Sequence, residues 1–179
     1  MKKIIALALA AALLLSFTSC TKQNGTGTSS GALKGQPKNA LEILEKVWSK
    51  YSADEKFSAT GGSEKHMKED KPGKFDVSDA EALDFELGFP KANASEIDDA
   101  ASLMHMLNQN NFSCGVYHVK GSGNAEALAG KIKENILARQ WLCGFPEKLV
   151  ILTVGDYVVS LNSFALFNDR SIVDTTALV

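Results

Sequence analysis

Apolar residues recur at helical spacing in three segments of the chain. In the longest of them, Leu128, Ile132 and Ile136 fall four residues apart, which aligns them on one face of a helix. In another, Ser95 is a suitable N-cap in front of an apolar stripe that includes Met104. We therefore expect helices over 40–51, 95–107 and 124–141.

Strand patterns are found in two places. Residues 112–119 alternate between two apolar faces. Further along, the apolar runs 149–154 and 157–161 are separated only by Gly155-Asp156, and a two-residue connection that begins with glycine is typical of a type II′ hairpin turn. Because the first run is apolar on both faces, we expect this hairpin to be central and covered on both sides.

The remaining segments are less regular. Residues 52–74 are polar and contain several glycine and proline turn signals, which indicates a long surface loop with a short strand near Phe57. The alternation in 76–89 fits a half-buried strand, whereas Asp79 and the residues after it fit the start of a short helix equally well. We expect 163–179 to form a short helix that closes the core.

The order of these elements predicts an α+β fold in a single domain. A small mixed sheet, with the Gly155-Asp156 hairpin at its centre, would be packed by helices. The step from strand 112–119 through a helix to strand 149–154 would be a right-handed crossover if the two strands are parallel.

The start of the chain has the organisation of a secretory signal peptide. Lys2 and Lys3 precede an unbroken apolar run, 4–15, which is shorter than the roughly 20 residues that a membrane-spanning helix needs. Small residues then lead to Cys20. This arrangement resembles the lipobox of bacterial lipoproteins, where the cysteine thiol receives a diacylglycerol and the peptide is cleaved just before it. Phe17 stands where that motif favours Leu, so ordinary secretion with a free Cys20 remains the alternative.

The segment after Cys20 has the composition of a linker. Residues 21–38 are rich in Gly, Ser, Thr, Gln and Asn and contain no aromatic residue, so they cannot bury enough apolar surface to become ordered. We therefore divide the chain into a signal peptide, 1–19, a lipid-anchored flexible tether, 20–38, and a globular domain, 39–179.

Charge and cysteine content restrict the partners and the compartment. The sequence has 19 basic and 21 acidic side chains, a net charge of −2, and no basic stripe, which argues against nucleic acid as a partner. Contact with a membrane would therefore depend on the lipid on Cys20. The other two cysteines, Cys114 and Cys143, could form a disulfide outside the cytoplasm, and two buried free thiols are the alternative.

The sequence predicts no catalytic residue, metal ion or cofactor. Cys114 and His118 lie four residues apart on a predicted strand, roughly 13 Å, which is too far for a thiol–imidazole pair. The Met-His-Met run at 104–106 has copper-binding side chains, but on a helix they would point in different directions. The glycine-containing turn at 121–123 lacks the third glycine of a dinucleotide-binding motif, and Glu126 stands in its place.

An aromatic cluster at 141–146 is the most distinctive local feature. Trp141 and Phe145 flank a glycine, and Pro146 fixes the entry into the next strand. These three residues could form an exposed ledge that binds a protein or a polysaccharide. The favoured alternative is that the aromatic side chains plug the open end of the core.

Three long runs carry a resemblance to other proteins. They are PGKFDVSDAEALDFELGFP (72–90), IDDAASLMHMLNQNNFSCGVYHV (97–119) and NILARQWLCGFPEKLVILTVGDYVVS (135–160). The runs resemble a family of uncharacterised secreted or lipid-anchored proteins of gut-dwelling, mostly clostridial, bacteria. Leu161-Asn162 departs from the aromatic–glycine pair that members often have at this point. The resemblance implies an envelope lipoprotein domain and names no substrate.

The function predicted from these observations is that of an envelope-anchored bacterial lipoprotein with a non-enzymatic binding or adaptor domain. It would sit on the outer face of the cytoplasmic membrane or elsewhere in the cell envelope, and it would contact an envelope protein or polymer. An enzyme whose site one sequence does not reveal is the alternative, and a purely structural envelope component is a third. A pocket with convergent polar groups and a strongly shifted ionisable residue would favour the enzyme.

Overall fold

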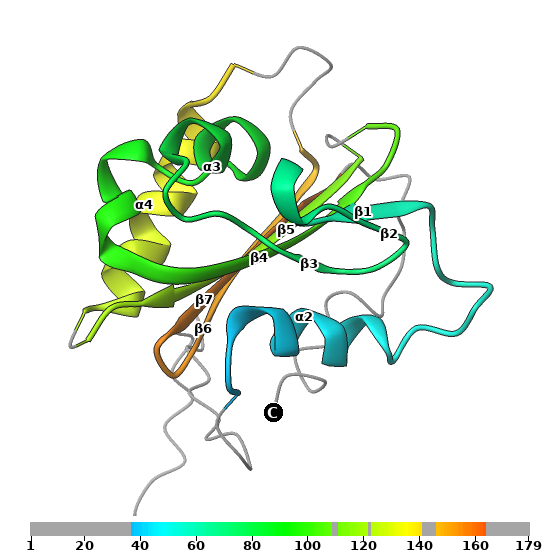
Figure 1. The fold of residues 1–179 in the computed structure, drawn as a ribbon. Helices are drawn as coiled ribbons and strands as arrows, with labels where there is room; N and C mark the ends of the chain where they lie inside the picture. The colour runs from blue at the N-terminus through cyan, green and yellow to red at the C-terminus, as the bar shows by residue number, and fades with distance from the viewer. Residues whose placement is uncertain (1–36, 109–110, 122, 141–145, 164–179) are drawn as a thin grey trace, which may run out of the picture.

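The structure is a computed structural model that describes residues 37–108, 111–121, 123–140 and 146–163. These residues form the expected α+β fold, in which one seven-stranded sheet has helices on both faces (Figure 1). The described elements are α2 (Ala40–Trp48), β1 (Ala59–Gly61), η1 (Glu64–His66), β2 (Lys68–Glu69), β3 (Gly73–Lys74), α3 (Ala80–Leu87), η2 (Lys91–Glu96), β4 (Ile97–His105), β5 (Phe112–Val119), α4 (Ala125–Ala138), β6 (Lys148–Val154) and β7 (Tyr157–Ser163).

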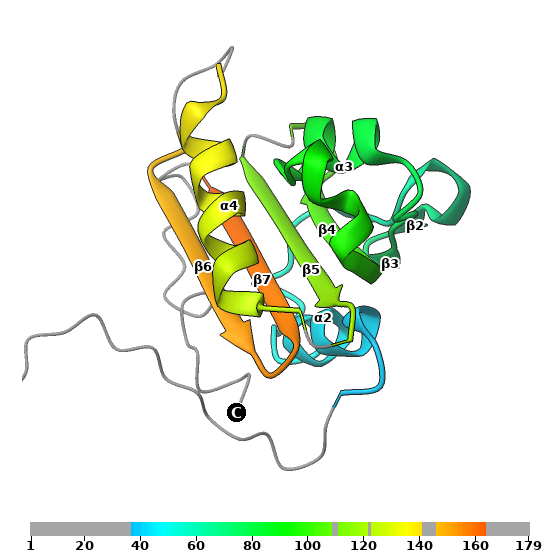
Figure 2. The same ribbon diagram turned by 90° about the vertical axis from the view of Figure 1, so that its left-hand side faces the viewer.

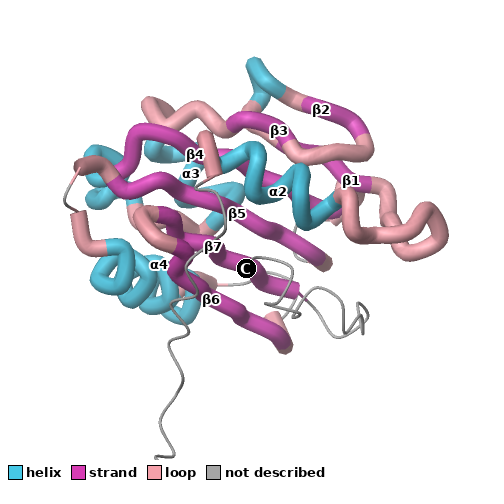
Figure 3. The backbone as a smooth tube through the Cα atoms, turned by 90° about the horizontal axis from the view of Figure 1, so that it is seen from below, coloured by secondary structure: helices cyan, strands magenta, loops and turns pink. Residues whose placement is uncertain are grey.

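The strands follow the order β2-β1-β4-β5-β7-β6, and β3 also pairs with β4 (Figure 3). Each pairing between described strands is antiparallel, so the sheet is not the mixed sheet that we expected. The strands β5 and β6, which α4 connects, do run parallel to each other, but β7 lies between them and is antiparallel to both. The β6–β7 hairpin therefore lies at one side of the sheet, with β6 at its edge.

Two hydrophobic clusters lie on opposite faces of the sheet. On one face, α2 packs Ile43 and Leu44 against β4 and β5. On the other face, α3 and α4 cover the strands, and α4 contributes Leu128 and Ile132 (Figure 2). The domain thus has three layers, with the sheet in the middle.

The helices α2 and α4 confirm two of the predicted helices. Each begins after an asparagine whose side-chain oxygen accepts a hydrogen bond from the first turn: Asn39 from the Glu42 N–H at 2.8 Å, and Asn124 from the Ala127 N–H at 3.0 Å. Such caps satisfy backbone donors that have no partner inside the helix. The helical spacing of the apolar residues and the caps act together, so these two helices begin within a residue of the predicted positions.

The predicted helix over 95–107 is wrong, because most of these residues form the strand β4, Ile97–His105. In this strand Ala100 and Ala101 are both fully buried, one in each hydrophobic cluster. A strand that is covered on both faces loses the alternation of apolar and polar residues. Alanine, leucine and methionine also favour helices, and here tertiary packing overrides that preference. Ser95 lies in the short η2 helix and caps nothing.

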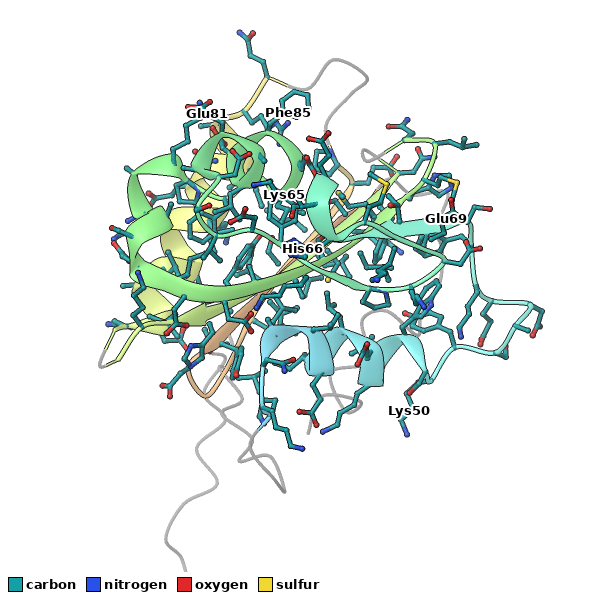
Figure 4. All side chains as sticks on the ribbon, in the orientation of Figure 1. Lys50, Lys65, His66, Glu69, Glu81 and Phe85 are labelled. Atoms are coloured by element: carbon teal, nitrogen blue, oxygen red, sulfur yellow. The ribbon has the colours of Figure 1, made fainter. Side chains whose placement is uncertain are left out.

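Of the two alternatives for 76–89, the structure contains the helix, α3. Asp79 caps its start by accepting a hydrogen bond from the Ala82 N–H at 2.9 Å, and Gly88 ends it with a φ of 68°. The alternation that suggested a strand is accidental, since Leu83 is buried whereas Phe85 points outward and is 70% exposed (Figure 4).

The segment 52–74 is more structured than the predicted loop. It contains β1, η1, β2 and β3, and β1 pairs with both β2 and β4. These strands are two or three residues long, too short for a periodic pattern to reveal. The short strand expected near Phe57 corresponds to β1.

The prediction of a hairpin is confirmed, but its central position is wrong. Gly155 has a φ of 58°, as the first position of a type II′ turn requires. Along β6, Val150 and Leu152 pack toward α2, whereas Leu149 and Ile151 pack toward α4. An edge strand packed on both faces has the same apolar run as a central one, which is why the sequence suggested a central strand.

Candidate functional site

Polar side chains from several separate segments meet in an open depression at the N-terminal end of α2. Its volume is about 610 Å³. Its walls come from the residues before α2, from β3, β4 and β5, and from the β6–β7 turn, which lies near the start of α2 in Figure 1. The lining side chains include those of Lys74, Asp98, Asp99, His118 and Tyr157.

A bulge in β4 brings two neighbouring carboxylates into this depression. The register between β4 and β5 shifts between Ile97 and Asp99, which leaves Asp98 without a partner residue on β5. In a regular strand, Asp98 and Asp99 would point to opposite faces. The extra residue changes this direction, and both side chains line the depression.

Asp98 binds His118, which is the partner of Asp99 across the sheet. The Nδ1 atom of His118 is 2.5 Å from Oδ1 of Asp98, and the imidazole ring lies 4.7 Å from the ring of Tyr157. A carboxylate on one ring nitrogen fixes the orientation of an imidazole, as in acid–base pairs. Both partners are partly exposed, with 29% of the His118 side chain and 48% of the Asp98 side chain accessible.

The carboxylate of Asp99 binds the N-terminus of α2. Its Oδ2 accepts a hydrogen bond from the Ala40 N–H at 2.7 Å, and the ammonium of Lys74 lies 4.0 Å from Oδ1. A negative charge is favourable at this end of a helix, where backbone N–H groups point outward. The main contribution of Asp99 is therefore to hold α2 against the sheet.

Tyr157 forms a hydrogen bond with the first residue that the structure describes, Pro37. Its hydroxyl donates a hydrogen bond to the carbonyl of Pro37 at 3.3 Å. Burial raises the pKa of Tyr157, and the negative charges of Asp99 and Asp98 raise it further. The phenol therefore remains a neutral donor near neutral pH and is not a base.

A second hollow lies on the same face of the sheet, beneath α2, and it is apolar. Its volume is about 50 Å³, and α2, Phe57 and four strands form its walls. Aromatic rings gather here, since Phe57 lies 5.3 Å from Trp48 and 5.0 Å from Phe112 between ring centroids. Benzene occupies a cavity of about 150 Å³, so this hollow suits the end of one aliphatic side chain.

Cys114 lies in the wall of this apolar cavity. Only 5% of its surface is exposed, and burial raises the pKa of its thiol to about 12. The thiolate is the reactive form of cysteine. Cys114 is therefore a packing residue at neutral pH and not a nucleophile.

Most of the other predicted site residues lie outside the described part of the chain. These are the lipid-attachment residue Cys20, the second member of the disulfide pair, Cys143, and the aromatic residues Trp141 and Phe145. The expected C-terminal helix over 163–179 also falls outside it, apart from its first residue, which ends β7. Pro146 is described and is buried in front of β6, so it is not exposed as part of a ledge.

The Met-His-Met run at 104–106 does not form a set of metal ligands. Met104 packs in the cluster with α3 and α4, whereas the His105 ring stacks at 5.6 Å on Phe57, on the opposite face of β4. Within the described ranges, no three His, Cys, Asp or Glu side chains are grouped so that they could hold a metal ion.

The pairing of Asp98 with His118 is not evident in the sequence. With a helix assigned to 95–107, Asp98 and Asp99 have the pattern of a solvated helix face. The available signal is the pair of aspartates at the start of an otherwise apolar run, which is compatible with a strand that carries a bulge at its end.

Comparison with known proteins does not add to this picture, since no family model, curated protein or solved structure matches the chain. Within the described residues, no helix is long and apolar enough to cross a membrane.

Proposed function

We propose that the chain is a lipoprotein of the bacterial envelope, anchored through Cys20, and that its folded part is a non-enzymatic binding or adaptor module. The start of the sequence supports the anchor, through its two lysines, its short apolar run and the position of Cys20. The module would contact a protein of the envelope.

The apolar cavity beneath α2 is the observation that carries the binding role. It lies beside aromatic side chains, which are frequent anchors of protein contacts. Its volume of about 50 Å³ fits the tip of one Leu, Ile or Val side chain. A sugar polymer presents hydroxyl groups that such a cavity could not satisfy, so a protein is the better partner.

The ionisable groups that line the apolar cavity and the polar depression support binding over catalysis. Cys114 is held as a thiol by its raised pKa, and Tyr157 is held as a neutral phenol. Asp99 is committed to the N-terminus of α2. Enzymes usually place a group with a shifted pKa so that it gains reactivity, whereas the shifts at Cys114 and Tyr157 reduce it.

Site-specific photo-crosslinking in intact cells tests this proposal. A photoreactive amino acid at Tyr51, at the cavity, should form an adduct with one envelope protein, whereas the same group at Lys50, which points away from the domain in Figure 4, should not. Filling the cavity with Val150→Ile and Val159→Ile should abolish the adduct, and Val154→Ile, which does not line it, should leave it intact. Adducts that persist in the filled variant would contradict the proposal.

An enzyme is the second candidate, and the Asp98–His118 pair is the observation that favours it. A histidine oriented by a carboxylate in a depression of about 610 Å³ could act as a general acid or base. His118→Gln distinguishes the two functions. If the domain is a binding module, His118→Gln should leave the Tyr51 adduct unaffected. If the domain is an enzyme, cells that carry His118→Gln should show the same defect as cells that lack the protein.

A further inference from the structure

The sheet has two edges that differ in length and in protection. At one edge, β2 consists of two exposed charged residues, Lys68 and Glu69. At the other, β6 extends over Lys148–Val154, contains no proline and pairs with β7 in an unbroken register. Natural sheets protect their edges with short strands, charges, prolines or bulges. The edge at β6 has only Lys148, at its first position.

Alternate residues of β6 turn their backbone groups away from the sheet. The two-residue turn makes Val154 and Tyr157 a hydrogen-bonded pair, so the even-numbered residues of β6 bond to β7. The N–H and C=O groups of Leu149, Ile151 and Thr153 therefore face outward. Among the strands that the structure describes, β6 pairs with β7 alone.

We propose that two copies of this chain associate through β6, in antiparallel register about a twofold axis at Ile151. In this register Ile151 lies opposite Ile151 of the second copy, and Leu149 lies opposite Thr153. The outward-facing residues are placed symmetrically about the axis. Every outward N–H and C=O group of one copy consequently meets its complement on the other, and the two sheets become one.

The side chains and charges of β6 fit this pairing. On the α2 face, Val150 lies opposite Leu152 of the second copy, which joins the apolar surfaces of the two sheets. Lys148 lies opposite Val154 and near the turn that carries Asp156. The pairing thus brings opposite charges toward each other and keeps the two copies of Lys148 at opposite ends.

The helix layer offers a second contact on the other face. The Thr153 hydroxyl donates a hydrogen bond to Glu126, which identifies the side of α4 that faces the β6 edge. Gly130 and Leu137 follow Glu126 on this side at helical spacing. Leu137 is 45% exposed, and a Cβ at Gly130 would meet no atom within 4 Å. The twofold axis sets the two α4 helices side by side, where Leu137 becomes covered and Gly130 allows close approach.

Cysteine crosslinking tests the register. In the full chain carrying Cys143→Ser, Ile151→Cys should form a disulfide with its own copy, because opposed residues of this type have Cα atoms about 5.5 Å apart, within disulfide range. Leu149→Cys and Thr153→Cys, alone, should not, since each lies roughly 13 Å from its counterpart. A mixture of these two variants should crosslink. Equal crosslinking at all three positions would overturn the register.

Proline substitution tests the association itself. Ile151→Pro removes an outward N–H and leaves the pairing of β6 with β7 intact, whereas Val150→Pro removes a bond to β7. By light scattering in detergent, the full chain should have the mass of two copies. Ile151→Pro should have the mass of one copy and should still unfold in a cooperative thermal transition, which shows that the domain remains folded. A full chain with the mass of one copy would overturn the proposal. The same result would be obtained if another segment of the chain or another protein occupied the β6 edge.

Discussion

The hydroxyl of Tyr117 occupies the space in which a side chain at residue 115 would lie. A Cβ on Gly115 would be 2.2 Å from this oxygen and 2.6 Å from the ring carbon that bears it. Tyr117 is fully buried, and its ring packs 4.7 Å from Phe89. The glycine is therefore required by a neighbouring side chain two residues along the same strand, and not by its own backbone conformation.

We expect Gly115→Ala to destabilise the domain by about 1–3 kcal/mol, because the rigid ring of Tyr117 must move. Urea denaturation measures this loss as a lower midpoint. Gly130→Ala is the matched control when both changes are made in the single-copy Ile151→Pro background, since this helical glycine then has open space around it, and the change should stabilise α4 by up to about 1 kcal/mol. Equal effects of the two substitutions would contradict the packing described.

Trp48 joins α2 to the loop before β3. Its indole N–H donates a hydrogen bond to the carbonyl of Asp70 at 3.0 Å, and Asp70 has a positive φ of 53°. Trp48→Ala should cost about 3–5 kcal/mol, whereas Trp48→Phe, which leaves mainly the carbonyl without its donor, should cost about 1–3 kcal/mol. Thermal unfolding monitored by circular dichroism gives both values. Lys50→Ala, at an exposed position, is the control and is expected to leave the stability of the domain unchanged.

Glu86 gives the domain a pH dependence of defined sign. Burial raises its pKa above the ordinary 4.5, and the charges of Asp79 and Glu64 raise it further. The folded state therefore binds the proton more tightly than the unfolded state, and stability falls as the pH rises through and above 4.5. Glu86→Gln should stabilise the domain at pH 7 by about 0.5 kcal/mol, with the gain absent near pH 3. Melting temperatures at both pH values, with exposed Glu134→Gln as control, test this.

The thiol of Cys114 should be unreactive in the folded protein. With Cys143→Ser to remove the other thiol of the domain, iodoacetamide at pH 8 should label Cys114 only after urea is added, because the thiol is buried and its pKa is about 12. Mass spectrometry follows the labelling. Equal rates with and without urea would contradict the burial. In the unsubstituted chain the same assay determines whether Cys114 and Cys143 are free or bonded to each other.

The membrane anchor has a direct test. Cys20→Ser should release the mature chain from the membrane fraction into the soluble fraction, because the thiol that would carry the lipid is removed. Cell fractionation and immunoblotting measure the distribution. Cys143→Ser is the control and should leave it unchanged, whereas membrane retention of the Cys20→Ser chain would exclude lipidation as the anchor.

The parts of the fold that could be predicted are those whose local pattern agrees with their tertiary environment. The strand β5 and the β6–β7 hairpin combine apolar strand runs with a glycine turn, and α4 combines helical spacing with an asparagine cap. The strand β4 lacks such agreement, because Ala100 and Ala101 are buried on opposite faces and no polar face remains. Its assignment depends on pairing with β1, β3 and β5, which a single sequence does not encode locally.

The candidate site follows the same rule. Asp98 and His118 are twenty residues apart, and they meet only because a bulge displaces Asp98 beside the end of β5. The apolar cavity is equally non-local, since its walls combine α2 with four strands. Residue types at one position do not reveal such convergence, because it depends on the order in which the strands are placed in the sheet.

The unequal edges of the sheet also set a limit on growth. A unit with open strands on both sides could add further units without end, as the chains in a fibril do. Here the outer side of β2 offers two charged residues, Lys68 and Glu69, and little backbone for a newcomer to bind. Once two β6 strands have joined, both free ends of the combined sheet are β2 strands. Assembly therefore stops at a closed pair, and the stoichiometry is determined by an edge that takes no part in the contact.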